Sequence, residues 1–447
     1  MKHLRLLLAL AGGLALVLII LITLNLDAVT AAPSATTRYV LGSSGSDSSD
    51  CTSSQKPCKT IQYALAQANA GDTIRVAKGL MPITYAGTVS IDKSVTLEGG
   101  WGAVGSGGGL IWQRSSPCDA SWTTIDAGGT GRAISIRGNI TPTIDCFTIT
   151  GGDADGLGGD PDGPDAGGGI YSNGAAPIIV NNVITANYGC DSCSSTYGHG
   201  GGIYLLDAPA TAVISNNLIA NNIGANTTLG WGGGIMLRDS QAQILSNTIQ
   251  DNRGGIAGDG GGIMIVGGSP IIANNTILRN RAATGVMGNG GGIFVRSSTP
   301  VTIEHNHLQN NYALDGTAVP TMTSKGGGIY YSGNPTGIAS IHDNLIRANA
   351  ATNDETGAGG GMYLTDLIDP SSISGNTVED NRASWSLEGH GGGIYLNDST
   401  ATVADNQVFN NTAASGGPTG GLGNGGGIYI QSGGGLVKNN VITQNIG

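Results

Sequence analysis

The chain repeats one pattern of glycine, apolar and asparagine positions nine times. Each copy opens with Gly-Gly-Gly and an apolar anchor, and twelve to fifteen residues later comes Asn-x-[Ile/Leu/Val]-x-x-Asn. The period is about 32 residues, and the segment before the next glycine triplet varies in length. A constant unit with a variable insertion predicts a solenoid, with residues 188–199 and 312–325 as excursions from it. The anchors are Ile170, Ile203, Ile235, Ile263, Ile293, Ile329, Met362, Ile394 and Ile428.

Short alternating runs within each copy predict about three β-strands per coil. One follows the glycine triplet, a second is a run such as residues 401–404, and the third is Asn-x-Ile. Coils stacked about 4.8 Å apart would pair each strand with the same strand above and below. The asparagines suit the left-handed bends between strands and can form a ladder of amide hydrogen bonds along the stack. A ligand-binding role for Asn187 or Asn222 is the alternative.

The first 149 residues differ from the repeats. Residues 1–32 carry Lys2 and Arg5 before an uncharged apolar run, which predicts a signal peptide or an uncleaved anchor and hence export. Residues 33–149 are expected to form an N-terminal cap and the first coils. They include a short helix over 60–70, with Ile61, Leu65 and Ala68 on one face, and strands at 73–77, 89–97 and 133–136.

Residues 150–447 are then expected to be nine regular coils. The sequence ends directly after the last asparagine pair, without a closing element. A solenoid needs a terminal cap to stay soluble. We therefore expect the C-terminal cap to be absent, with further coils or a surface-anchoring module beyond residue 447.

Composition narrows the possible partners. The chain has 78 glycines among 447 residues, only 11% charged residues and a net charge of -11. An acidic chain without clustered Lys and Arg is not expected to bind nucleic acid. Export permits disulfides, and the six cysteines allow 15 pairings, of which Cys51 with Cys58 is favoured. The cysteines are Cys51, Cys58, Cys118, Cys146, Cys190 and Cys193.

The repeats resemble a known family. Residues 60–79, TIQYALAQANAGDTIRVAKG, look like the entry to secreted right-handed parallel β-helix proteins of the pectate-lyase-like fold, and Asn-x-Ile-x-x-Asn resembles their generic coil. The pairing of GGG[I/M] with the asparagine motif is also similar to the repeats of polymorphic outer-membrane adhesins. The resemblance covers about residues 60–447. It implies an all-β, right-handed parallel β-helix solenoid with a short N-terminal capping helix, a fold that carries lyases, hydrolases, esterases and adhesins.

A column of mostly aromatic residues follows the anchors. Strand alternation points the residue after each anchor away from the core. A row of rings about 40 Å long, by the coil spacing, would suit stacking on sugars. The alternative is that the rings stack on each other and stabilise the sheet surface. The predicted glycan-binding residues are Tyr171, Tyr204, Phe294, Tyr330, Tyr363, Tyr395 and Tyr429, with Met236 and Met264 between them.

A second candidate centre contains Arg238, Asp207 and Asp239. In polysaccharide lyases of the resembled fold, acidic side chains hold Ca²⁺ against the substrate carboxylate while an Arg or Lys removes a proton. Arg238 beside the two aspartates is the nearest match in this sequence. Aspartate is also an ordinary turn residue, and that is the alternative for Asp207 and Asp239.

A glycine-rich acidic segment precedes the first full repeat. Five aspartates with no basic residue among them suit a weak Ca²⁺ site, and a solvated acidic loop is the alternative. The CxxC at Cys190 and Cys193 is expected to be a loop disulfide or a free pair rather than a zinc site. His305 and His307 are expected to be a solvated pair. The predicted Ca²⁺ ligands are Asp153, Asp155, Asp160, Asp162 and Asp165.

The Gly-x-Gly-Gly-Gly frame supplies one more weak signal. Gly-His-Gly at 198–200 and 389–391 also occurs in polygalacturonases of this fold, but the partner carboxylates of that family are not evident here. Histidine is one choice among several at the x position, which holds His199, Trp231, Asp259, Asn289, Ala358, His390 and Asn424.

Two functions therefore remain open. The uniform coils and the aromatic column favour a secreted or cell-surface, non-catalytic module that binds a polysaccharide or cell-surface glycan, or acts as an adhesin. A Ca²⁺-dependent lyase acting on uronic-acid polymers is the alternative. Membrane attachment would come only through the N-terminal segment or a C-terminal module outside this sequence.

Overall fold

The computed structural model describes residues 35–106, 109–193, 197–316, 322–353, 356–416 and 421–447. Residues 37–447 form one unit. The predicted signal peptide or anchor at 1–32 lies outside the described residues. Among the residues that are described, no helix has both the length and the apolar character needed to cross a membrane.

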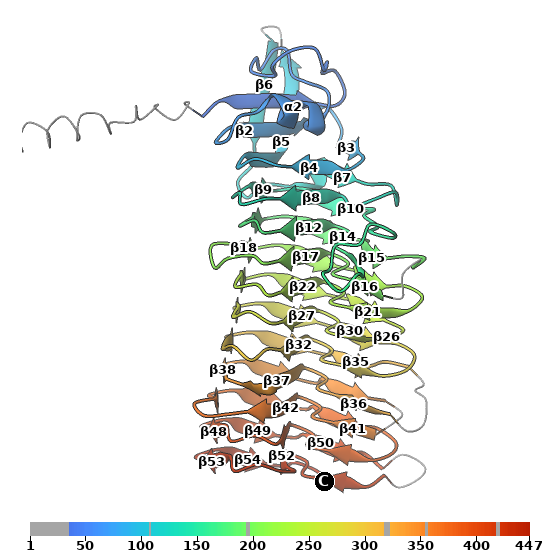
Figure 1. Ribbon diagram of the computed structural model, residues 1–447, viewed down its shortest axis with the longest axis vertical. Helices are drawn as coiled ribbons and strands as arrows, with labels where there is room; N and C mark the ends of the chain where they lie inside the picture. The colour runs from blue at the N-terminus through green and yellow to red at the C-terminus, as the bar shows by residue number, and fades with distance from the viewer. Residues whose placement is uncertain (1–34, 107–108, 194–196, 317–321, 354–355, 417–420) are drawn as a thin grey trace, which may run out of the picture. The chain divides into compact units, whose positions relative to one another are not determined.

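The unit 37–447 is a right-handed parallel β-solenoid of about 12 turns with almost no helix, so the predicted fold is confirmed. The described strands form five sheets, A to E, of 14, 12, 11, 8 and 9 strands. Figure 1 shows their stacking, in which each strand pairs with its counterpart in the coils on either side. One coil runs through sheets C, A, B, D and E in turn, as β17 (Ile203–Leu206), β18 (Val213–Ser215), β19 (Leu218–Ala220), β20 (Ile223–Ala225) and β21 (Leu229–Trp231).

The coil contains two more strands than the three predicted. Sheets D and E lie in the segment whose variable length indicated a loop, and the variation is confined to the connection between them. The predicted excursion at 188–199 begins with β15 (Tyr188–Cys190) and ends with β16 (Tyr197–His199). The one at 312–325 begins with β35 (Tyr312–Leu314) and ends with β36 (Thr323–Lys325).

Apolar side chains from the strands of sheets A, B and C fill the bore of the solenoid. In β17, Ile203 and Leu205 are fully buried and belong to this core, whereas Tyr204 points to the opposite side of the sheet and joins a separate cluster. The anchors pair in register from coil to coil, for example Ile203 with Ile235. The two-residue period of the sequence therefore sets which residues fill the bore.

The glycine triplet is required by close backbone approaches. Gly200 has a φ of +57°, a left-handed conformation that favours glycine. A Cβ on Gly201 would lie 2.2 Å from the carbonyl oxygen of Ile223, and one on Gly202 would lie 2.5 Å from that of Gly234 in the next coil. Each glycine thus has a separate steric reason, which explains why the triplet recurs.

Two asparagine ladders run along the stack, as predicted. The amide of Asn222 donates to Oδ1 of Asn252 at 3.0 Å, and Asn252 repeats this bond to Asn280. The left-handed bend falls on the preceding residue instead, for example Asn221 with φ +56°. The prediction that the ladder asparagines occupy the bend is therefore wrong by one position. Their side chains are buried because they satisfy backbone groups of two coils.

The predicted helix is present but shorter, and the strand predicted over 89–97 is two strands separated by residues 92–95. The helix α2 (Ile61–Gln67) is capped by Thr60, whose side chain accepts a hydrogen bond from the Tyr63 backbone amide, and it buries Ile61, Ala64 and Leu65. It contacts β1 (Thr37–Leu41), β2 (Thr73–Lys78) and β4 (Val89–Ile91). The strands β5 (Thr96–Ser106) and β8 (Ile134–Arg137) then continue sheets A and C toward the repeats.

Candidate functional site

The aromatic column is stacked and largely covered. Ring centroids lie 4.7 Å apart between Phe294 and Tyr330, 5.3 Å between Tyr330 and Tyr363, and 4.7 Å between Tyr363 and Tyr395, with nearly parallel planes. Only Tyr330 and Tyr429 are partly exposed; Tyr171, Tyr204, Phe294, Tyr363 and Tyr395 are buried, with at most 6% of each residue exposed. The column is therefore not the exposed strip that the sequence predicted, and the mutual stacking alternative describes it.

Sheet E explains this burial. Its outward residues pack over the outward face of sheet C, so Tyr171, Tyr204 and Phe294 form a second apolar cluster outside the bore, with Ala166 and Trp231 from sheet E. Lys325 of β36 likewise lies 5.0 Å from the centre of the Tyr363 ring. Because sheet E was not predicted, the cover over the rings could not be seen in the pattern.

Arg238 is joined to the acidic segment rather than to Asp207. Its Nη1 donates to Oδ1 of Asp160 at 2.8 Å and its Nη2 donates to Oδ2 of Asp162 at 2.6 Å, while Nε lies 3.9 Å from Oδ2 of Asp239. Asp207 and Asp239 have φ near +50°, which agrees with the turn alternative. Burial opposes the charge of Arg238, but the bond to Asp162 and the charge of Asp160 raise its pKa. A raised pKa is the opposite of what a proton-abstracting base needs.

Asp160 is the centre of a buried polar network. Its Oδ2 accepts a hydrogen bond from the Tyr204 hydroxyl at 2.7 Å and lies 3.1 Å from Nδ1 of His199. Burial alone would raise the pKa of Asp160, but hydrogen bonds from His199, the Asp162 amide and Tyr204 lower it below its ordinary value. The carboxylate therefore stays charged. Through His199, Tyr204 and Arg238 it connects the acidic segment to three coils.

The other aspartates of this segment hold its turns. Asp153 accepts from the amides of Asp155 and Asp191, and Asp165 accepts from the Gly158 amide at 2.7 Å. Asp155 lies beside the Sγ of Cys190. These contacts do not gather the five carboxylates around one point, and Arg238 already neutralises two of them. Donor atoms of Asp155 and Asp165 do lie within 4.8 Å of each other, so Ca²⁺ binding by this segment stays a prediction.

Three disulfides link the six cysteines. They join Cys51 to Cys58, as predicted, Cys118 to Cys146, and Cys190 to Cys193, which agrees with a loop disulfide at the CxxC.

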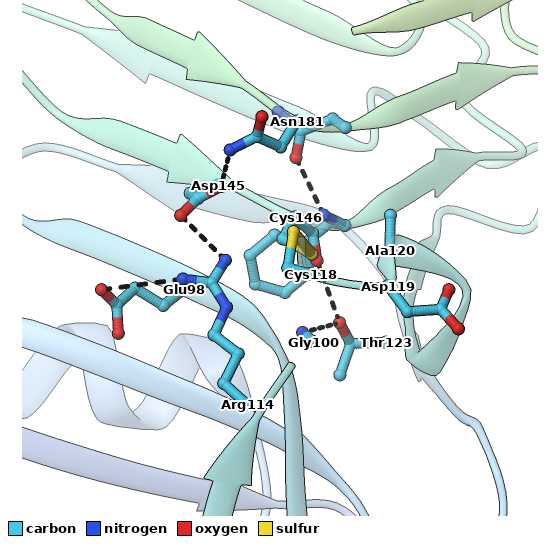
Figure 2. The surroundings of a disulfide bond; sticks show 12 residues. Glu98, Gly100, Arg114, Cys118, Asp119, Ala120, Thr123, Asp145, Cys146 and Asn181 are labelled. Atoms are coloured by element: carbon cyan, nitrogen blue, oxygen red, sulfur yellow. Dashed lines mark hydrogen bonds and ion pairs between the residues drawn. A yellow bond between two sulfur atoms is a disulfide. The ribbon is translucent and has the colours of Figure 1, made fainter. Parts of the chain in front are cut away.

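A polar cavity of about 720 Å³ lies beside the second disulfide, and Cys118 lines it. Figure 2 shows that Arg114 points at Asp145, with Nη2 and Oδ2 2.8 Å apart, while the amide of Asn181 donates to the other oxygen. Arg114 and Asp145, two charged residues that line this cavity, are therefore already paired with each other. A cavity of about 590 Å³ that is also lined by Arg114 includes Trp122, whose ring lies under the Lys78 ammonium at 3.4 Å.

A third cavity, the Trp231 cavity, lies on sheet E. Its volume is about 300 Å³, and its lining is mainly apolar: Leu229, Trp231, Ala257, Gly258, Asp259, Val286, Met287 and Met322. Trp231 in β21 pairs with Asp259 in β26 (Ala257–Asp259), so the indole and the carboxyl group lie side by side in adjacent coils. His199 stacks on the Trp231 ring from the preceding coil, with centroids 4.6 Å apart.

Asp259 is the one acidic group that lines the Trp231 cavity. The Asn289 amide donates to its Oδ1 at 2.8 Å. Burial raises the pKa of Asp259 to about 6, against the opposing effects of Asn289 and Arg296. An aromatic face beside a carboxyl group that titrates near neutral pH is an arrangement typical of binding and catalytic sites.

Replacing Asp259 with Asn is expected to stabilise the protein at pH 8 but not at pH 4. Because the pKa is raised above the ordinary 3.8, its stabilising contribution is complete below pH 3.8 and is lost as the pH rises through about 6. The wild type should therefore be less stable than Asp259→Asn by about 1–3 kcal/mol at pH 8. Urea unfolding at pH 4, 6 and 8 measures the gap, and an equal gap at all three values would contradict the pKa.

Sequence reasoning missed the Trp231 cavity, although a signal existed. Trp231 and Asp259 both occupy the x position of the Gly-x-Gly-Gly-Gly frame, where the variation was visible. Because the residue types at the x position differ from coil to coil, the sequence did not indicate that these side chains lie on one face of a sheet. The structure does so, because sheet E pairs them in register from Ala166 to Asn424.

Comparisons with known proteins identify a family for this chain. No curated protein matches the chain. Similar solved structures include a periplasmic alginate epimerase (11% identity, 83% of this chain and 77% of that chain, TM-score 0.40) and the Dettilon tailspike protein (16%, 88% and 69%, 0.41). An alginate lyase from Paenibacillus is also similar (12%, 88% and 99%, 0.33). The sequence profile described as "right handed beta helix region" matches residues 106–447, and the chain therefore belongs to the right-handed β-helix family.

Proposed function

We propose that this β-helix is a non-catalytic glycan-binding module of a secreted or cell-surface protein, and that the Trp231 cavity is its binding site. The observation that carries the proposal is the accessible apolar cavity with Trp231 and Asp259 side by side. The apolar face of a sugar ring can pack on an indole, while its hydroxyl groups bond to a carboxyl group.

The surroundings hold Trp231 ready for such a contact. His199 stacks on one face of the indole, and the buried Asp160 carboxylate lies 3.1 Å from Nδ1 of His199. Asp160 of the acidic segment thus fixes His199, and His199 in turn fixes the Trp231 indole. A ring already fixed in place loses little conformational entropy when a sugar binds.

Replacing Trp231 with Ala is expected to weaken binding to a glycan about 5- to 10-fold, since an aromatic contact contributes about 1 kcal/mol. A panel of neutral and acidic polysaccharides in affinity electrophoresis would identify the ligand and measure the change. Trp385→Ala is the matched control, because Trp385 is 52% exposed and does not line the cavity. Equal binding by both variants, or no binding by the wild type to any glycan, would contradict the proposal.

The Ca²⁺-dependent lyase alternative is not the function we propose, because Arg238 is engaged with Asp160 and Asp162. It has a separate test. The same polymers can be followed for the absorbance of unsaturated products, with and without EDTA. Product that forms only without EDTA would establish the lyase instead.

The helix α2 is proposed to act as the N-terminal cap. It buries Ile61, Ala64 and Leu65 against strands of the first coils, and these residues join the same apolar core as the bore. Covering the first coil protects its strand edges from pairing with another chain.

A further inference from the structure

The strongest unassigned feature is a cluster of two histidines and two carboxylates on adjacent coils. Glu304 ends β33 (Val301–Glu304) and is followed by His305, and His342 ends β38 (Ala339–His342) and is followed by Asp343. The two strands pair in register, with Glu304 opposite His342. The structure therefore brings together four side chains that the sequence separates by 38 positions.

The contacts within this cluster are close. Nε2 of His342 lies 3.2 Å from Oε2 of Glu304, and Nδ1 of the same ring lies 3.0 Å from Oδ2 of Asp343. The two nitrogens of His305 lie 3.9 Å from those same carboxylate oxygens. One donor atom from each of Glu304, His305 and His342 lies within 4.8 Å of the others. His305 is exposed, as expected of a solvated residue, and its ring faces Asp343 of the next coil.

The repeat makes this cluster stand out. The two positions before the first ladder asparagine hold no such group in the flanking coils, where they are Ala273 and Asn274 on one side and Ser374 and Gly375 on the other. Neither the coil architecture nor the ladder requires histidine or glutamate at these positions. A concentration of metal-ligating residue types in two adjacent coils, outside the repeat pattern, indicates a local function.

We propose that Glu304, His305 and His342 bind one Zn²⁺ ion that bridges the two coils, with Asp343 holding the other nitrogen of the His342 ring. Two imidazoles and one carboxylate, with a water in the fourth position, suit tetrahedral zinc, whereas Ca²⁺ prefers oxygen ligands only. Zinc ligands lie about 2.0–2.2 Å from the ion, so small rotations of these partly exposed side chains would close the site. The ion would bind Nε2 of His342 on the side that faces Glu304, while Nδ1 keeps its contact with Asp343.

The test is calorimetric titration of the untagged chain with zinc chloride. One saturable site per chain is expected, and His305→Asn and His342→Gln should each weaken it at least 10-fold. His305→Asn keeps the fold, because His305 has a φ of +54° and asparagine tolerates that conformation. His390→Gln is the matched control, since His390 lies 3.2 Å from one carboxylate, Glu388, without a second histidine in that pair.

A second readout separates zinc binding from a structural role of the histidines. The thermal midpoint of the wild type and of His390→Gln should rise with added zinc, and that of the two cluster variants should not. Calcium chloride should leave all four unchanged. The proposal is overturned if the wild type shows no saturable zinc site, or if the cluster variants bind zinc as tightly as the control.

Discussion

Replacing Gly230 with alanine is expected to destabilise the solenoid by at least about 3 kcal/mol. Gly230 is the middle residue of β21 in sheet E, and it faces the backbone of sheet D. A Cβ there would lie 2.0 Å from the carbonyl oxygen of Gly254 and 2.4 Å from the amide nitrogen of Ala225. Both are backbone atoms of paired strands, so the clash can be relieved only by separating the two sheets.

Gly434→Ala is the control for this experiment. Gly434 is exposed, has no atom within 4 Å of a built Cβ, and does not adopt a left-handed φ. Its replacement should change the free energy of unfolding by less than about 0.5 kcal/mol. Urea unfolding followed by far-UV circular dichroism measures both variants. If Gly230→Ala were as stable as Gly434→Ala, sheets D and E would not be in backbone contact.

The same contact accounts for much of the glycine content of the chain. The middle residues of the sheet D strands are glycine or alanine, as in β20 and β30 (Arg281–Ala283). The sheet E positions in register with Gly230 are glycine except in β11 (Asp165–Ala166), which has Asp165, and in β36, which has Ser324. Two sheets that meet without side chains between them leave no apolar pattern of the usual kind. This is why both sheets escaped prediction, although the bore strands of the same coils were found from their period of two.

The limits of sequence reasoning at the candidate sites have a similar origin. The outward direction of Tyr204 follows from alternation along one strand, but its burial depends on a second sheet and on Asp160 of an earlier segment. Arg238 and Asp160 lie 78 residues apart, and no local pattern links them. The pattern therefore could not show that Arg238 pairs with two of the aspartates in the acidic segment, Asp160 and Asp162. In contrast, the Cys51–Cys58 disulfide could be predicted because the two cysteines are only seven residues apart in the sequence.

The asparagine ladder was predicted because every step of it repeats, and its energetic weight can be tested at one rung. Replacing Asn222 with alanine is expected to destabilise the protein by about 3–5 kcal/mol. The Asn222 amide donates to the carbonyl oxygens of Ile184 and Ala220 and to Oδ1 of Asn252. Its Oδ1 accepts from the amide and backbone nitrogens of Asn187. Alanine would leave these buried partners without their bonds.

The neighbouring residue provides the control, because Asn221 has the same side chain but is exposed and adopts φ +56°. Asn221→Ala should cost only the strain of that conformation, about 1 kcal/mol, and Asn221→Gly should cost almost nothing. The urea midpoints of Asn222→Ala, Asn221→Ala and Asn221→Gly show whether the ladder or the bend contributes more to stability. Because Asn222 bonds to two other coils, its loss should also increase amide exchange in the coils of Asn187 and Asn252, whereas Asn221→Ala should leave that exchange unchanged. Equal destabilisation by Asn222→Ala and Asn221→Ala would mean that the bend, rather than the ladder, holds the coils in register.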